Sequence, residues 1–253
     1  MATRTQLALL GTNGWYDTQL GSTICLLIKT DRFSVILDAG LGISKLDEHP
    51  VADKPAYLFL SHYHLDHIYG LHVLAKFAFK QGLTIFGQPG IEEDLRRILT
   101  PPFTIAPEQL PYQVSFREVP RDAPQFPFGC QTAALRHAAP TIGARLELNG
   151  LRIAFVPDTG YCENAVKLAR GADLLLTECA HAPGEENGDW PHLNPETAAR
   201  IAVEAGAKRL LLVHFAPTNY PTADKRREAE AVARRIFPAT DAGFDGMELD
   251  LAG

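Results

Sequence analysis

The sequence lacks several features that mark whole classes of protein. Among its 253 residues there are only four cysteines, and none forms a Cys-x-x-Cys pair. This argues against a disulfide framework or a zinc knuckle and fits reduced thiols in a cytoplasmic protein. No stretch approaches the roughly 20 apolar residues needed to cross a bilayer. The first residues show no apolar signal segment, so we expect a cytoplasmic protein that does not associate with membranes.

Basic charge is also scarce. The chain has 24 Lys and Arg against 30 Asp and Glu, which gives a net charge of -6. Because affinity for a phosphate backbone comes mainly from Lys and Arg, this balance argues against a large nucleic-acid partner. The hydrophobic fraction of 46% is enough for a substantial core. At this length the chain is one large domain or two fused small ones, and we expect a single domain over residues 1–253.

The most informative feature that is present is the run SHYHLDH at residues 61–67. It follows the apolar residues 56–60, which predict a buried strand. His62 and His64 are two residues apart, so they point the same way on an extended segment. Asp66 and His67 can turn toward a second point in space. Since imidazole and carboxylate are the usual ligands of zinc and similar metals, this one run can serve two neighbouring metal ions.

The rest of the chain predicts strands first, and then strands mixed with helices. The expected strands are residues 7–10, 23–29, 33–37, 131–135, 144–148, 151–156, 174–177 and 209–213. The expected helices are residues 70–79, 90–99, 164–170, 195–205 and 223–237, with a Pro-rich, less regular region at 82–130. Two halves of similar order predict two packed sheets flanked by helices. The basic residues of the last helix, Arg226 among them, are expected on a solvated face.

Three further candidate ligands follow apolar strands. His137 comes after residues 131–135, Asp158 after 151–156 and His214 after 209–213. Each therefore lies just past the C-terminal end of a strand, as His62 does, where loops on a rigid scaffold commonly carry chemistry. A lone histidine is more often a packed core residue, but four positions arranged alike indicate a built site.

These residues, in this order, resemble the two-metal signature of the metallo-β-lactamase superfamily over nearly the whole chain. The fold that this resemblance implies is an α/β (α+β), four-layer αββα sandwich with the metals in a cleft at one edge. It implies the following ligands: His62, His64 and His137 for one metal, Asp66, His67 and His214 for the other, and Asp158 as a bridge. Asp38, just after a strand, is either a turn residue or an acceptor that orients a ligand imidazole.

The chemistry that the resemblance implies is hydrolysis. Two divalent ions would share a hydroxide that attacks a carbonyl carbon or a phosphorus, and they would stabilise the oxyanion that develops. Zinc suits such ligands, although manganese or iron could also occupy them. Asp66 would then act in catalysis as well as in metal binding.

Two more residues indicate which branch of the superfamily this chain resembles. Glu178 follows the strand 174–177, and His192 precedes the helix 195–205. Both stretches resemble ribonuclease Z and cyclic phosphodiesterases, in which a glutamate pairs with a histidine that protonates the leaving group. The alternative is that Glu178 and His192 simply cap a loop and a helix. Only residues 138 to 157 separate His137 from Asp158, which leaves no room for the arm with which ribonuclease Z grips tRNA.

The sequence therefore predicts a metal-dependent phosphodiesterase that acts on a small phosphodiester, cyclic ones included. Three alternatives stay open: an ester, thioester or lactone hydrolase similar to glyoxalase II or acyl-homoserine lactonases, a ribonuclease without an arm, and a non-enzymatic binding module. Aromatic residues on loops near the ligands could stack on a base or sugar, or merely pack: Trp15, Tyr16, Tyr63, Tyr161, Trp190 and Tyr220. The sequence leaves open whether the protein forms a homodimer.

Overall fold

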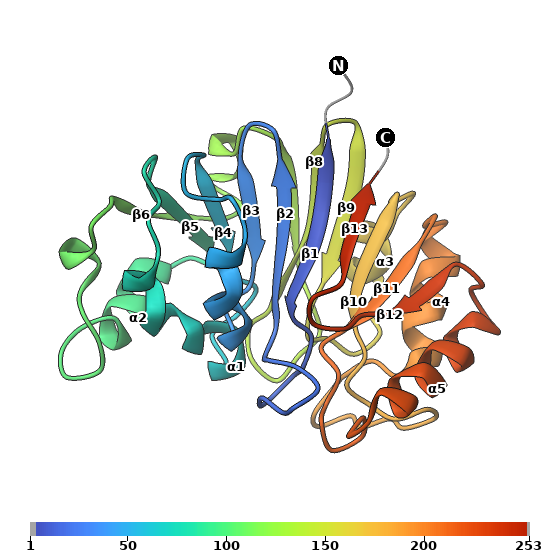
Figure 1. Ribbon diagram of the computed structural model, residues 1–253. Coiled ribbons are helices and arrows are strands. Elements are labelled where there is room, and N and C mark those ends of the chain that lie inside the picture. Colours follow the sequence, from blue (N-terminus) through green and yellow to red (C-terminus); the bar gives the residue numbers. More distant parts are fainter. Residues whose placement is uncertain (1–3, 252–253) are drawn as a thin grey trace.

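The computed structural model describes residues 4–251 and places two β-sheets face to face (Figure 1). The first sheet joins, in spatial order, β13 (Glu248–Leu251), β1 (Thr5–Gly11), β2 (Cys25–Thr30), β3 (Ser34–Leu37), β4 (Ala56–Phe59), β5 (Leu83–Gly87) and β6 (Val114–Glu118). The second joins β12 (Thr240–Ala242), β11 (Leu210–Val213), β10 (Leu174–Glu178), β9 (Leu151–Val156), β8 (Ile142–Leu148) and β7 (Gly129–Ala134).

Helices cover the outer face of each sheet. The α-helices are α1 (Leu65–Ile68), α2 (Ile91–Ile98), α3 (Glu163–Ala169), α4 (Pro195–Ala205) and α5 (Ala223–Arg234). Four 3-10 helices accompany them in the described residues: η1 (Leu41–Glu48), η2 (Tyr69–Lys76), η3 (Pro107–Gln109) and η4 (Ala123–Gln125). Figure 1 shows α3, α4 and α5 on the second sheet. The order of layers is helix, sheet, sheet, helix, which is the predicted αββα sandwich.

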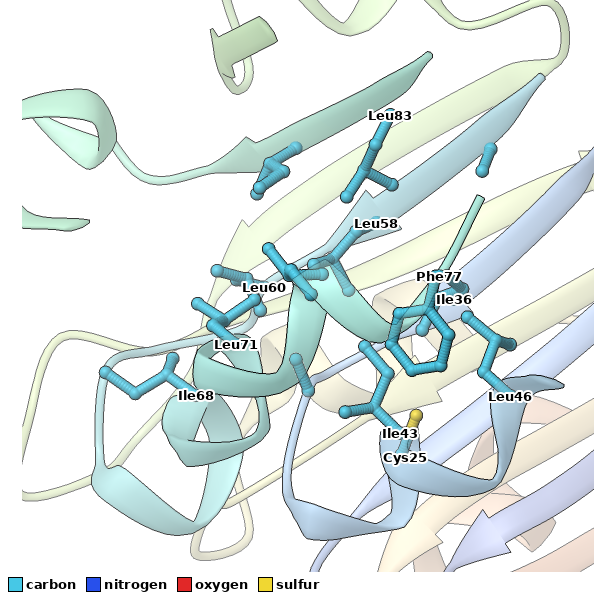
Figure 2. Packing of buried hydrophobic residues seen from close by; sticks show 14 of the residues in the cluster. Cys25, Ile36, Ile43, Leu46, Leu58, Leu60, Ile68, Leu71, Phe77 and Leu83 are labelled. Carbon is cyan, nitrogen blue, oxygen red and sulfur yellow. The ribbon is translucent and has the colours of Figure 1, made fainter. Parts of the chain in front are cut away.

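The core follows from the two-residue period of the strands. In β1, Leu7 and Leu9 face the other sheet, whereas Ala8 and Leu10 face the covering helices. Both faces of each central strand are therefore apolar, as expected for strands buried on two sides. Figure 2 shows the outer cluster of the first sheet, in which Ile43 of η1 and other helical side chains pack against strand residues. The layers hold the strand ends in fixed positions.

Most of the expected elements are confirmed, but four expectations are wrong. Residues 82–130 contain two strands, β5 and β6, that the Pro-rich composition obscured. The helix expected at 70–79 is instead a 3-10 helix, Tyr69–Lys76, that continues from the short α1. The short strands β12 and β13 near the C-terminus were not predicted. Arg226 is only 1% exposed and does not lie on a solvated face.

Strand directions bring the candidate site together. β9, β10 and β11 run parallel, and β7 pairs antiparallel with β8, which pairs antiparallel with β9. The C-terminal ends of β7, β9, β10 and β11 therefore meet at one edge. In the first sheet β3 and β4 are parallel as well, and the chain beyond β4 enters α1 at that edge (Figure 1).

None of the helices in the described part of the chain has the length and apolar character of a membrane span.

Candidate metal centre

Two groups of donor atoms converge where the strands end. The structure brings together all seven residues that the sequence singled out as ligands. Within each group the donor atoms lie within 4.8 Å of one another: His62, His64, His137 and Asp158 in the first group, and Asp66, His67 and His214 in the second. A further overlapping set joins Asp158, His214 and His192. Strand ends and the first turn of α1 therefore supply donors to one compact cluster.

Asp158 lies between the two groups and turns one carboxylate oxygen toward each. Its Oδ2 lies 3.8 Å from Nε2 of His62 and 3.7 Å from Nε2 of His137. Its Oδ1 lies 3.2 Å from Nε2 of His67 and 3.2 Å from Nε2 of His214. A carboxylate in this position can contact an ion in either group, which is the geometry that a bridging ligand requires.

Asp38 supports both groups from behind. Its Oδ2 accepts a hydrogen bond from Nδ1 of His67 at 2.7 Å and another from the Ser61 hydroxyl at 2.8 Å. The Ser61 oxygen lies 3.0 Å from Nδ1 of His62. Asp38 therefore orients one histidine directly and a second through Ser61, which sequence reasoning missed. The signal was available, because Ser61 immediately precedes His62 after a buried strand.

These contacts leave the other imidazole nitrogens as free acceptors. Nδ1 of His137 donates to the carbonyl oxygen of Pro191 at 3.3 Å, so His62, His67 and His137 each use Nδ1 as a donor. Their Nε2 atoms then carry lone pairs directed at the cluster. Nε2 of His67 lies 3.1 Å from Nε2 of His214, and Nε2 of His62 is buried without a hydrogen-bond partner. Converging buried acceptors of this kind fit divalent cations.

The carboxylates of the cluster supply the negative charge that bound cations require. Burial alone would raise the pKa of Asp158, but the imidazoles of His214 and His67 lower it well below its ordinary range. Burial would lower the pKa of His67, yet the carboxylates of Asp158, Asp66 and Asp38 raise it well above its usual value. The carboxylates of Asp158 and Asp66, whose pKa values are lowered, therefore attract positive charge, from protons or from metal ions.

The backbone is strained at three residues of this region. Trp15, Asp38 and His214 adopt φ angles of 64°, 57° and 53°, in the left-handed region that bulky residues rarely adopt. Such strain persists only where the surrounding contacts determine the conformation, and it clusters at functional sites. Of these three residues, His214 and Trp15 line one cavity, and Asp38 is buried behind the donor groups.

Glu178 and His192 form the pair that the sequence suggested. Nδ1 of His192 lies 2.8 Å from Oε1 of Glu178, and this carboxylate also accepts hydrogen bonds from the backbone N–H groups of Thr159 and Ala180. Glu178 is the last residue of β10 and is fully buried. Burial lowers the pKa of His192, but the carboxylate of Glu178 outweighs that effect and raises it to about 9. A pKa of about 9 favours the protonated imidazole at neutral pH.

A cavity of about 840 Å³ opens over the donor groups. Its lining includes His64, Asp66, Asp158, His192 and His214, together with Trp15 and Trp190. The aromatic residues near the ligands separate into distinct roles. Tyr220 is 2% exposed and its hydroxyl donates to the carbonyl oxygen of His181, so it is a packing residue. Tyr161 lies over a separate, smaller cavity of about 260 Å³ that shares His192.

Sequence comparisons agree with this geometry. A family model described as "Beta-lactamase superfamily domain" matches residues 34–215. A ribonuclease Z from Bacillus licheniformis is 30% identical, over 97% of this chain and 99% of that protein. The probable metallo-hydrolase YhfI of Bacillus subtilis is 26% identical over 94% of this chain and 98% of its own length. A ribonuclease Z from Nostoc is 37% identical, but the match covers 40% of this chain and only 33% of that enzyme.

Solved structures share the fold over almost the full length. Bacillus subtilis YhfI superimposes with a TM-score of 0.79 at 23% identity, covering 98% of this chain and 100% of YhfI. The short form of human tRNase Z gives a TM-score of 0.75 at 20% identity, covering 96% and 98%. A diphosphatase described as belonging to the PhnP family gives 0.73 at 17% identity, covering 98% of both chains.

Proposed function

This chain belongs to the β-lactamase superfamily, in the branch of metal-dependent hydrolases that includes ribonuclease Z, and from that premise we propose that it cleaves a small phosphodiester, linear or cyclic. One observation carries the narrower substrate class. Nδ1 of His192 lies 2.8 Å from Oε1 of the buried Glu178, beside the donor cluster. Relatives named ribonuclease Z and the PhnP-family diphosphatase act on phosphorus centres by name, which supports the same class.

The pair suits the departure of an alkoxide. Cleavage of a phosphodiester expels a strongly basic oxygen, which needs a proton as the bond breaks. Glu178 holds Nδ1 of His192 and keeps the ring protonated, because the charge of the carboxylate raises the pKa of His192 to about 9. The other ring nitrogen, Nε2, is then the proton donor. Backbone N–H groups of Thr159 and Ala180 fix the carboxylate, so the direction of the ring is fixed as well.

The donor groups would hold two divalent ions. We propose the following assignment: His62, His64 and His137 for one ion, Asp66, His67 and His214 for the other, and Asp158 for both. Zinc is the expected metal, with manganese or iron as alternatives. When bound, the ions supply Lewis acidity, which lowers the pKa of water and offsets charge on the phosphoryl oxygens. Asp66 and Asp158 contribute the negative charge that retains them, and Asp38 orients His67 and His62.

An RNA substrate is less well supported. The chain between His137 and Asp158 is occupied by β8, a turn and β9, so it carries no inserted arm. Among the described residues that line the large cavity there is no lysine or arginine, although a phosphate backbone is bound chiefly by those side chains. An ester or lactone substrate would make the pair of Glu178 and His192 superfluous, since its leaving group needs less help from an acid.

Hydrolysis of bis(p-nitrophenyl) phosphate and of p-nitrophenyl acetate by the zinc- or manganese-loaded protein tests the proposal. Wild type should cleave the phosphodiester, and Asp158→Ala should abolish that activity. His72→Ala is the matched control, because His72 is an exposed histidine outside both donor groups, and it should retain full activity. If wild type cleaves only the acetate or a lactone, the acyl-hydrolase alternative replaces the proposal. Turnover of precursor tRNA in preference to small diesters would favour the ribonuclease.

A further inference from the structure

Both tryptophans of this chain line the large cavity above the donor groups. The sequence contains two, Trp15 and Trp190, and both belong to the lining of the cavity of about 840 Å³. Their side chains are 68% and 49% exposed. Large apolar side chains are normally buried, and exposed ones gathered beside a candidate site indicate a binding surface. Their placement therefore calls for a ligand-based explanation.

Trp15 is held rigidly beside the second donor group. Its backbone N–H donates to Oδ2 of Asp66 at 2.7 Å, and its φ angle of 64° is in the left-handed region. The preceding Asn13 is buried and donates to the carbonyl oxygens of Tyr16 at 3.0 Å and of Gly21 at 2.8 Å. The loop is thus fixed by internal hydrogen bonds while the indole remains in the cavity. Such a loop presents a surface to a ligand without a cost in loop ordering.

Trp190 is anchored to the first donor group. Its ring lies parallel to that of His64, with 5.8 Å between centroids and an interplanar angle of 8°. It meets the ring of His137 edge-on at 5.7 Å and 65°. Its backbone N–H donates to Oδ1 of Asn187, and its carbonyl oxygen accepts from Nε2 of His181. Each tryptophan therefore contacts a different donor group, and the cluster lies between their anchoring points.

The charge of the cavity limits what can occupy it. Its lining in the described part of the chain has no lysine or arginine, and its carboxylates are Asp66, Asp158 and Glu185. Beyond the metal centre, a polyanion would meet only one cationic side chain, the imidazole of His192. A ligand with one phosphate at the donor groups and an uncharged planar ring fits this lining, because indole faces bind aromatic rings by stacking.

We propose that Trp15 and Trp190 form a binding site for a planar aromatic group, a nucleobase or an aryl ring, that the phosphoester substrate carries. The inference rests on the proposed function and extends it, since it names the group attached to the phosphate. It makes the two tryptophans specificity determinants for that reaction. His192 would protonate the leaving group of an ester held at the donor groups, and the indoles select which ester is cleaved.

Tryptophan fluorescence tests binding at this site and needs no turnover. Because the chain has only two tryptophans, each can be followed separately. Trp15→Phe leaves Trp190 as the sole emitter, and Trp190→Phe leaves Trp15. Phenyl phosphate and adenosine monophosphate are titrated into each zinc-loaded variant, and ribose phosphate serves as the matched probe without an aromatic ring. We expect saturable changes in emission in both variants with a ring-bearing probe and none with ribose phosphate. A response to adenosine monophosphate alone assigns a nucleobase, and a response to both assigns any aromatic ring. Equal responses to ribose phosphate, or no response, would overturn the proposal.

Kinetics separates this inference from the proposed function. Phenyl p-nitrophenyl phosphate and methyl p-nitrophenyl phosphate share the p-nitrophenyl leaving group and differ only in the second ester group, so the ratio of their kcat/KM values measures selection of a phenyl ring on the group that phosphorus retains. Trp15→Ala and Trp190→Ala should each reduce that ratio by about ten-fold, and the Phe variants should largely retain it. Phe103→Ala removes an equally exposed aromatic side chain outside the cavity lining and should leave the ratio unchanged.

Three results distinguish a failure of the aromatic site from a failure of the proposed function. If wild type cleaves both diesters and no tryptophan variant changes the ratio, the aromatic site is wrong and the phosphodiesterase stands. If it cleaves neither diester while the fluorescence response holds, the aromatic site stands and the phosphodiesterase is wrong. The third result is that the wild-type chain forms a dimer, which Trp15→Ala or Trp190→Ala converts to a monomer while the ratio is unchanged. This would assign the tryptophans to an interface and overturn the proposal.

Discussion

Oδ2 of Asp38 lies 2.7 Å from Nδ1 of His67, and both side chains are completely buried. The carboxylate fixes His67 as the tautomer whose Nε2 faces the donor cluster, and through Ser61 it does the same for His62. We expect Asp38→Asn to weaken metal affinity by about 10- to 100-fold, as removal of such supporting hydrogen bonds typically does. Competition with a chromogenic chelator measures it. Unchanged affinity would contradict the orienting role of Asp38.

Gly14 lets the ring of His214 lie against the backbone. A Cβ atom at residue 14 would come within 2.4 Å of Cε1 and 2.8 Å of Nε2 of His214. We therefore expect Gly14→Ala to displace the ring, to cost about 1–3 kcal/mol of stability and to reduce metal binding at the second donor group. Metal analysis after dialysis, with circular dichroism to establish folding, checks this. Gly188→Ala is the control, because nothing lies within 4 Å of a Cβ there, and it should bind metal normally.

The charge of Glu178 sets the alkaline limit of activity. Glu178 raises the pKa of His192 to about 9, so the protonated imidazole is present below that pH and is lost as the pH rises through it. We expect kcat/KM to fall above pH of about 9 in wild type. In Glu178→Gln the neutral amide no longer stabilises the imidazolium, so the fall should begin at lower pH. A descending limb at the same pH in both proteins would show that another group causes it.

Arg226 is buried beneath the loop that carries Trp15. Its guanidinium donates to the Thr12 hydroxyl at 2.8 Å and contacts Oδ1 of Asn13, and it lies 4.8 Å from the ring centroid of Phe215. Arg226→Met keeps the volume but leaves these acceptors unpaired. We expect a loss of about 1–3 kcal/mol in the free energy of unfolding, measured by urea denaturation. In the Trp190→Phe background, the anisotropy of Trp15 emission should also fall. Unchanged anisotropy would mean that Arg226 does not fix the loop.

The metal-centre residues were predictable because the pattern that reveals them is local. Asp158 and His214 each follow an apolar strand of the second sheet, and parallel strands end at the same edge, so strand assignment alone brings these two together. His62 follows β4 of the first sheet and meets them because the two sheets pack face to face. Glu178 and His192 were found from stretches that resemble a known pair. The layered fold followed from the order of strands and helices for the same reason.

What the sequence concealed depends on contacts between distant segments. The buried position of Arg226 needs the loop of residues 12–14 above it, although the small residues Ala229 and Ala233 on the same helical face could have indicated a buried side. Gly14 reads as a turn residue until His214 is placed against it. Trp15 and Trp190 are far apart in the sequence, and only the fold shows that they line the same cavity.

The leaving-group dependence of phosphodiester cleavage tests the central claim, that His192 donates the proton in a metal-dependent reaction. Methyl p-nitrophenyl phosphate and methyl phenyl phosphate differ in the basicity of the oxygen that departs. His192→Ala in the metal-loaded enzyme should lower kcat/KM by about 10²- to 10⁴-fold for the phenyl ester and by much less for the p-nitrophenyl ester, whose leaving group needs little protonation. Equal losses for the two esters, or no loss for either, would contradict the account.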